Sequence, residues 1–156
     1  MNPLHNKVAV ITGAASGFGR ELAIACANEG MRLALTDIDE KNLQGTADLL
    51  PSDTHVLTMK CDVAQAEQVE QLAVATYARF GAAHLLFNNA GVLVGGPLWT
   101  TTAQDWAWTY GINVMGVAHG IRSFVPRMLA QKDQCHIVNT ASVAGLLSVP
   151  GNGIYC

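Results

Sequence analysis

Short runs of β-branched and apolar residues alternate along the chain with longer segments in which apolar residues recur at helical spacing. The short runs predict strands over residues 7–12, 32–36, 54–59, 84–88 and 135–140. The longer segments predict helices over residues 17–29, 40–50, 67–80 and 103–131. The last of these contains several glycines and Pro126, so we expect it to be interrupted or kinked.

This alternation defines the fold class. Lys7–Thr12 (KVAVIT) is nearly all apolar, which is typical of a strand buried on both faces. Strands separated by helices form βαβ units, and right-handed crossovers restrict these units to few topologies. We therefore predict an α/β fold of the Rossmann type, a doubly wound parallel sheet in the order 3-2-1-4-5, with ligand binding between the first and fourth strands. No linker or repeat divides residues 1–156, so a single domain is expected.

Composition excludes several classes of function. Half of the residues are hydrophobic and only 13% are charged, where about 25% is ordinary for a soluble domain. No apolar stretch reaches about 18 residues and no signal peptide precedes the first strand, so we expect no membrane partner and a cytoplasmic location. The net charge of -3 and the scattered basic residues argue against nucleic acid as a partner. The cysteines and histidines share no metal-ligand spacing, so we expect reduced thiols and no metal site.

A glycine-rich loop, Thr12–Gly19 (TGAASGFG), joins the first predicted strand to the first predicted helix. Its glycines permit a tight exit from the strand and remove side chains where backbone must approach a pyrophosphate. The amino end of the helix would add free N–H groups and the positive end of its dipole. Glycine-rich turns also serve as plain connections, but this placement favours dinucleotide binding. The residues that we expect at the cofactor are Gly13, Ser16, Gly17, Phe18 and Gly19.

Asp37, which follows the second predicted strand, indicates which dinucleotide is bound. A carboxylate there can accept hydrogen bonds from the adenosine ribose hydroxyls, and it would repel a 2′-phosphate. An NADP site usually supplies Arg or Lys in the glycine loop or directly after the second strand, where this chain has Ala15, Ser16 and Ile38. We therefore predict NAD rather than NADP, with Asp37 and Ile38 at the cofactor. Capping of the next helix is the alternative role for Asp37, but Asp39 is better placed for it.

Further motifs follow in order along the chain. Asn88–Gly91 (NNAG) ends the fourth predicted strand, and Asn113 lies on the long helix within the sequence NVMG. Ser142 follows the fifth strand, and Tyr155 comes after it. Together with the TGxxxGxG loop, this set resembles the short-chain dehydrogenase/reductase family over nearly the whole chain. The resemblance implies that Asn89, Ala90 and Gly91 contact the cofactor.

The resemblance also implies a contact on the adenine side of the cofactor, made by Asp62 and Val63 after the third predicted strand. Asp62 fits equally well as a cap of the following helix, because aspartate is a preferred residue at that position. Both roles therefore stay open for Asp62.

The chemistry implied by the resemblance is hydride transfer between NAD(P) and an alcohol, ketone or aldehyde. Tyr155 would exchange a proton with the substrate oxygen and contact the cofactor, Ser142 would hydrogen-bond that oxygen, and Asn113 would hold a water that relays the proton. The ordinary pKa of tyrosine, about 10, is too high for a base at neutral pH, so a nearby cation must lower it. Each residue taken singly also has an ordinary structural role. Ser142 could be a turn residue, Tyr155 a partly buried aromatic residue and Asn113 a polar residue that distorts its helix.

Family members continue beyond the point at which this sequence stops, and they carry the cation, a lysine, one helical turn after the tyrosine. We expect residues 1–156 to be a C-terminally incomplete dinucleotide-binding domain, without the last strands and the substrate loop of the full fold. Taken alone, it is expected to be inactive. A non-catalytic NAD-binding sensor or scaffold protein is the alternative, favoured only by the missing lysine. A methyltransferase on a related fold would not need Asn88–Gly91 or the Ser142 and Tyr155 pair.

Substrate and subunit partners are defined only broadly by the sequence. A moderately hydrophobic alcohol or ketone would suit the apolar residues near the expected site, Val92, Leu93, Val94, Leu146, Leu147 and Val149. Packing is the role expected for the tryptophans, Trp99, Trp106 and Trp108. The resemblance implies a homo-tetramer or homo-dimer in the full-length form. Close packing on a partner subunit would suit the small residues of the long helix, Gly111, Gly116, Ala118 and Gly120.

Overall fold

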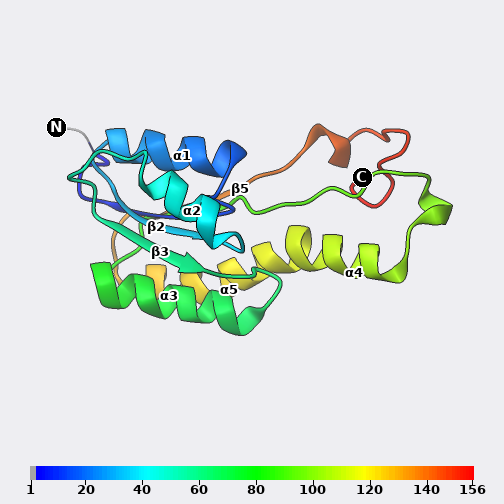
Figure 1. Ribbon diagram of the computed structural model, residues 1–156. Coiled ribbons are helices and arrows are strands. Elements are labelled where there is room, and N and C mark those ends of the chain that lie inside the picture. Colours follow the sequence, from blue (N-terminus) through cyan, green and yellow to red (C-terminus); the bar gives the residue numbers. More distant parts are fainter. Residues whose placement is uncertain (1–2) are drawn as a thin grey trace.

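Parallel strands form the centre of the molecule, for which a computed structural model describes residues 3–156. The strands are β1 (Val8–Thr12), β2 (Arg32–Asp37), β3 (Val56–Lys60), β4 (Leu85–Asn88) and β5 (His136–Asn139). Their order is β3-β2-β1-β4-β5, and every neighbouring pair is parallel (Figure 1). The predicted doubly wound topology is confirmed, with its switch point between β1 and β4. Met1 and Asn2, at the polar start of the chain, lie outside the described residues.

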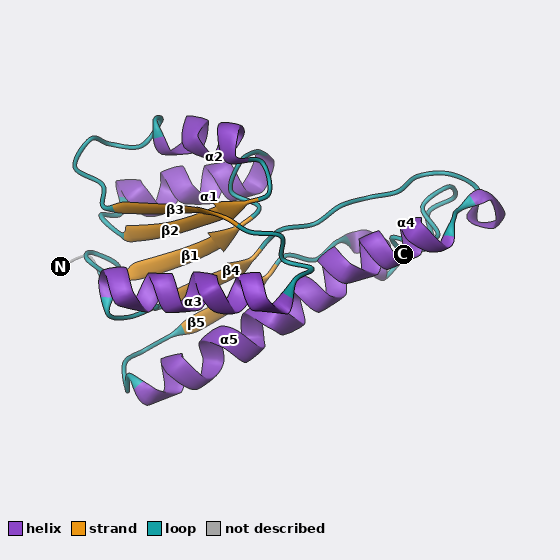
Figure 2. Ribbon diagram, turned by 60° about the horizontal axis from the view of Figure 1, so that its bottom comes forward, coloured by secondary structure: helices purple, strands orange, loops and turns teal. Residues whose placement is uncertain are grey.

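Helices cover both faces of the sheet. They are α1 (Gly17–Asn28), α2 (Glu40–Ala47), α3 (Ala66–Phe80), α4 (Ala103–Tyr110) and α5 (Gly116–Ala130). Helices α1 and α2 lie on one face, and α3 and α5 lie on the other (Figure 2). The predicted end of α2 at residue 50 is wrong, because Leu49 and Leu50 donate to the carbonyls of Thr46 and Ala47 in a tighter turn. Among residues 3–156, no helix is both long and apolar enough to cross a membrane.

Strand β1 belongs to two hydrophobic cores at once, and all of its residues are buried. Ala9 and Ile11 pack with side chains of α1 and α2, whereas Val8 and Val10 pack with side chains of α3 and α5. This division follows from the alternation of side chains along a strand. Full burial of a side chain such as Ile11 stabilises the fold by about 1.5–3 kcal/mol. The two cores therefore fix β1, and with it the start of the glycine loop.

The long helical stretch after β4 is not one regular helix. Helix α4 runs into a π-helical segment, η2 (Gly111–Met115), which runs into α5, so the predicted interruption lies in η2. A Cβ atom on Gly116 would lie 2.8 Å from Val63 Cγ2, and one on Gly120 would lie 2.1 Å from Asn88 Oδ1. These two glycines bring the helix close to its own chain, so the prediction that they pack on a partner subunit is wrong.

Helix α4 extends beyond the carboxyl edge of the sheet, together with the segments that follow β4 and β5 (Figure 1). These segments contain the short helices η1 (Leu98–Thr100) and η3 (Val143–Gly145). They are joined where the Gly96 N–H donates to the Gly151 carbonyl at 2.6 Å. This pairing fixes the segment that carries Tyr155 against the loop after β4.

A small polar cluster ties the opposite, amino edge of the sheet together. Asp133 Oδ2 accepts from Lys7 Nζ at 2.7 Å and lies 3.0 Å from His84 Nε2. The buried His84 ring accepts the Val8 backbone N–H at Nδ1, so its neutral form donates from Nε2 to Asp133. The hydrogen bond from Lys7 is the main cause that lowers the pKa of Asp133 from 3.8 to about 2. Burial lowers the pKa of His84 below its ordinary 6.5.

This cluster predicts a loss of stability in acid. Because both pKa values are lowered by folding, the stabilisation is complete at neutral pH and is lost as the pH falls, for Asp133 between 3.8 and about 2. Asp133→Asn should lower Tm at neutral pH, and the difference from the original chain should shrink toward the acid end of that range. Asp53→Asn, a change on an exposed turn, is the control. A Tm difference that does not vary with pH would contradict the assignment.

Candidate functional site

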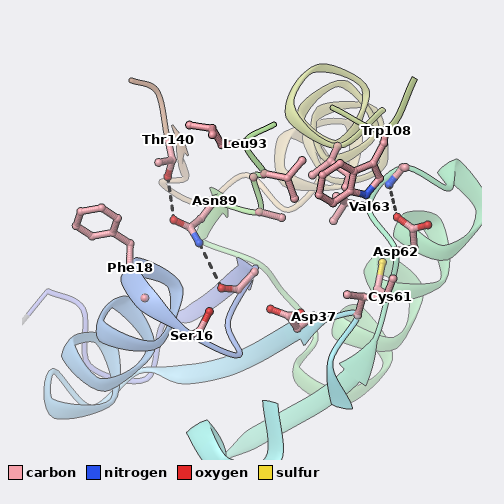
Figure 3. A pocket seen from close by; sticks show the side chains of 18 of the residues that line it. Ser16, Phe18, Asp37, Cys61, Asp62, Val63, Asn89, Leu93, Trp108 and Thr140 are labelled. Atoms are coloured by element: carbon pink, nitrogen blue, oxygen red, sulfur yellow. Dashed lines mark hydrogen bonds between the residues drawn. The ribbon is translucent and has the colours of Figure 1, made fainter. Parts of the chain in front are cut away.

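A cavity of about 770 Å³ lies at the carboxyl edge of the sheet, lined by residues that follow all five strands (Figure 3). The lining residues that the sequence predicted are Gly13, Ser16, Gly17, Phe18, Asp37, Ile38, Asp62, Val63, Asn89, Ala90, Gly91, Ser142 and Tyr155. Of the predicted site residues, Gly19 and Asn113 do not line the cavity. Gly19 packs against Gly13, and Asn113 bonds to Val92, and both of these neighbours do line it.

The glycine loop has no room for side chains at two positions. Gly13 has φ +68°, and a Cβ atom there would lie 2.8 Å from Ala90 Cα. A Cβ atom on Gly19 would lie 2.0 Å from the Gly13 carbonyl oxygen, so α1 packs directly on the loop. Ser16 is the N-cap residue of α1 but its side chain makes no capping bond. The N–H groups of the first turn are therefore available to an anion in the cavity.

Asn89 joins the ends of three strands. Its Nδ2 donates to the Thr12 carbonyl at 3.0 Å. Its Oδ1 accepts from the Thr140 hydroxyl at 3.1 Å (Figure 3). The Thr12 hydroxyl in turn accepts the backbone N–H groups of Asn89 and Ala90, each at 3.0 Å. The predicted Asn89 thus acts first as a structural link that shapes the cavity wall between β1, β4 and β5.

Thr46 and Arg20 hold the glycine loop in place by hydrogen bonds to its backbone carbonyls. The sequence did not indicate this role for either residue. The buried Thr46 hydroxyl donates to the Ala14 carbonyl at 2.9 Å and accepts from Arg20 Nε at 3.1 Å. The Arg20 guanidinium also donates to the Ala15 carbonyl. Arg20 is therefore engaged by the loop itself, and it does not line the cavity.

Asp37 also holds the glycine loop in place, by accepting a backbone N–H of the loop. Its Oδ2 accepts the Ala15 N–H and its Oδ1 accepts the Asp39 N–H, both at 3.0 Å. Asp39 is the N-cap of α2, where its side chain accepts the Asn42 N–H at 3.0 Å. The alternative role of Asp37 as a helix cap is therefore wrong, and the expected capping role of Asp39 is confirmed. The Asp37 carboxylate lies half-buried at the cavity, at the end of β2.

Asp62 and Val63 form a tight turn after β3. Asp62 Oδ1 accepts the Ala64 N–H at 3.0 Å, and the N-cap of α3 is Gln65, so a helix-capping role for Asp62 is wrong. His119 Nδ1 lies 2.9 Å from the Val63 carbonyl and ties this turn to α5. The turn is thereby held at the cavity, with the Asp62 side chain at its wall.

Of the three residues predicted for catalysis, two line the cavity and Asn113 does not. Ser142 and Tyr155 line the same cavity, and Ser142 Oγ accepts the Ala144 N–H at 3.2 Å as η3 begins. Asn113 Nδ2 donates to the Val92 carbonyl and its Oδ1 accepts the Val92 N–H, both at 2.8 Å. Each polar atom of this side chain thus makes one hydrogen bond to Val92, which ties η2 to the loop after β4.

Several lining residues were not predicted at the cofactor, among them Cys61, Ala64, Trp108, Ile112, Thr140 and Ala141. Of the three tryptophans expected to pack, Trp99 is 87% exposed and does not pack in this chain, whereas Trp106 and Trp108 are 45% and 48% exposed and are partly covered. Burial raises the pKa of the Cys61 thiol to about 11, so this cysteine is not a nucleophile at neutral pH. The spacing of Trp108 and Ile112, four residues apart on one helix, is the signal that could have placed them on one face.

A doubly wound sheet with a glycine loop, a carboxylate at the end of β2 and a cavity at the switch point defines a dinucleotide-binding α/β domain. The chain belongs to the short chain dehydrogenase family, whose model matches residues 7–156. The predicted family is confirmed, and it is a family of oxidoreductases.

Two solved structures and a curated relative illustrate this membership. A short chain dehydrogenase/reductase from Burkholderia phymatum in complex with NAD is 56% identical with a TM-score of 0.96, covering 99% of this chain and 56% of that one. A metagenomic short-chain oxidoreductase in complex with NADP is 31% identical with a TM-score of 0.90, covering 97% and 69%. The CLA biosynthesis dehydrogenase/reductase of Lactiplantibacillus plantarum is 37% identical, covering 99% and 54%. The chain therefore spans little more than half the length of the first and last of these proteins.

Proposed function

We propose that the protein is an NAD-dependent dehydrogenase/reductase that interconverts an alcohol and a ketone or aldehyde. The observation that carries this proposal is one cavity that is lined both by the glycine loop and Asp37 and by Ser142 and Tyr155. The complex of the Burkholderia phymatum protein with NAD supports the same cofactor.

The residues of the site fit a dinucleotide. The glycine loop leaves space where Cβ atoms would collide, and the uncapped amino end of α1 offers N–H groups for a pyrophosphate. Asp37 and Ile38 would hold the adenosine ribose, and Asp62 and Val63 the adenine. Asn89, Ala90 and Gly91 would lie along the middle of the cofactor. When bound, NAD supplies the hydride acceptor of the reaction.

Cofactor preference follows from the charge of Asp37, which favours ribose hydroxyls and repels a 2′-phosphate. Asp37→Asn should weaken NAD binding about tenfold and strengthen NADP binding, because hydrogen bonds to a charged group are the strong ones. Asp39→Asn removes the same charge two residues away, at the cap of α2, and should leave the ratio of the two Kd values unchanged. Equal effects of the two variants would contradict a specific role for Asp37.

The chain's own residues supply the proton chemistry. Tyr155 exchanges a proton with the substrate oxygen, and Ser142 donates a hydrogen bond to that oxygen while its Oγ keeps the Ala144 N–H. Asn113 fixes the loop after β4 by its two bonds to Val92, and it positions this wall of the cavity. A water that relays the proton would bind at Asn113, in the π-helical segment.

Substrate and assembly belong to the same proposal. Val92 and Leu93 make part of the cavity wall apolar, which favours a moderately hydrophobic small alcohol or ketone. A homo-dimer or homo-tetramer is proposed for the full-length protein. Incubation of the full-length protein with NAD and a panel of secondary alcohols, followed by NADH absorbance, tests the reaction. NAD binding without turnover on any member of the panel would instead support a sensor or scaffold protein.

A further inference from the structure

Trp108 is a half-exposed aromatic side chain in the wall of the cavity. It lies on α4 and is 48% exposed. Trp99 and Trp106, which are close in sequence, do not line the cavity, and Trp106 donates its indole N–H to the Thr101 hydroxyl. In Figure 3 the indole of Trp108 projects into the cavity on the side where Cys61, Asp62 and Val63 are drawn. The wall of that side is therefore extended by a flat apolar ring.

The position of Trp108 is fixed by the residues that follow it on the same helical stretch. Ile112 lies one turn further on and packs against the buried cluster of Cys61, Val63 and Val69. A Cβ atom on Gly111 would lie 3.4 Å from Ala64 Cβ, so the helix runs close to the turn after β3. Because the end of α4 is held on this turn, Trp108 is held beside it.

The side of the cavity near Trp108 is the one formed by β2 and β3. Asp37 ends β2, Ile38 follows it and Asp62 follows β3, whereas Ser142 follows β5 at the opposite edge of the sheet. Ile38 lines this side as well and is 62% exposed. Two large apolar side chains thus remain open to a ligand on the side of the cavity formed by β2 and β3, away from Ser142.

We propose that Trp108 forms a wall of the adenine subsite and contacts the base of the bound dinucleotide. This inference rests on the proposed function, which places the adenosine half of NAD beside Asp37 and Asp62. An indole offers a large rigid surface at low cost in side-chain entropy, and aromatic contact with a nucleobase is favourable whichever base edge faces it. The half-exposed ring becomes covered when the adenosine half binds.

Tryptophan fluorescence tests the contact without any turnover. ADP-ribose, which carries adenine but no nicotinamide, should quench the emission of the chain and of the W99F and W106F variants. The quenching should disappear in W108F, a conservative change that keeps an aromatic ring in the wall. A W108F variant that keeps the full response to ADP-ribose would overturn the assignment.

Calorimetry gives an independent measurement. The Kd of ADP-ribose should rise about tenfold in W108A, and it should be nearly unchanged in W106A, which removes an indole of similar exposure outside the cavity. If W108A does not fold, W108L replaces it, with the same rise expected. Wild-type affinity in either variant would overturn this inference alone, whereas an original chain that binds no ADP-ribose would overturn the proposed function with it.

Discussion

Gly19→Ala is expected to abolish NAD binding. The new Cβ atom would lie 2.0 Å from the carbonyl oxygen of Gly13, a backbone atom that cannot rotate away. The loop must then shift, and the shift would disturb the bond from Ala15 to Asp37. Crowding of this kind costs about 1–3 kcal/mol of folding free energy, so thermal unfolding should be measured beside the titration with NAD.

Gly45→Ala is the matched control, since a Cβ atom on Gly45 meets no atom within 4 Å. Gly45 lies within α2, where alanine stabilises a helix by about 0.8–1.0 kcal/mol relative to glycine. This variant should bind NAD as the original chain does and unfold at a slightly higher temperature. A folded Gly19→Ala chain with undiminished NAD affinity would show that the loop does not hold the cofactor.

Tyr155→Phe is expected to lower kcat for NADH formation by about 10²–10⁴-fold, the usual contribution of a positioned acid or base. The change removes one hydroxyl from a half-buried side chain that lines the cavity, so NAD affinity and Tm should change little. The measurement uses the full-length protein and an alcohol that the panel has identified as its substrate. Kinetics at saturating NAD then isolate the proton-transfer step.

Tyr110→Phe serves as the comparison for this prediction. Tyr110 ends α4, is exposed and does not line the cavity. Its variant should keep the original kcat. If Tyr155→Phe were as active as Tyr110→Phe, another group would be the acid or base and the mechanism proposed for Tyr155 would be wrong.

Local patterns in the sequence were enough to predict the sheet and most of the cavity. The apolar strand before Gly13 and the turn after β2 can each be recognised from a few consecutive residues. A parallel sheet then brings the turns after its strands to one edge. This is why the amino-acid sequence alone places the glycine loop, Asp37, Asp62 and Asn89 together. The end of α2 was less predictable, because Leu49 and Leu50 belong to a turn that precedes Pro51.

The contacts that sequence could not reveal join residues far apart in the chain. Thr46 reaches back to the Ala14 carbonyl, and Thr140 donates to Asn89 across the strand ends. Neither contact follows a local period, and both depend on how α2 and β5 pack against the sheet. The same reason applies to Trp108, whose place in the cavity depends on the packing of the helix on Val63 and Ala64.

A calorimetric titration of the chain with NAD and, separately, with NADP tests the central claim most directly. The account predicts that NAD binds to a single site and that its Kd is about tenfold lower than that of NADP, because Asp37 accepts ribose hydroxyls and repels a 2′-phosphate. Absence of NAD binding, or equal or tighter binding of NADP, would contradict it.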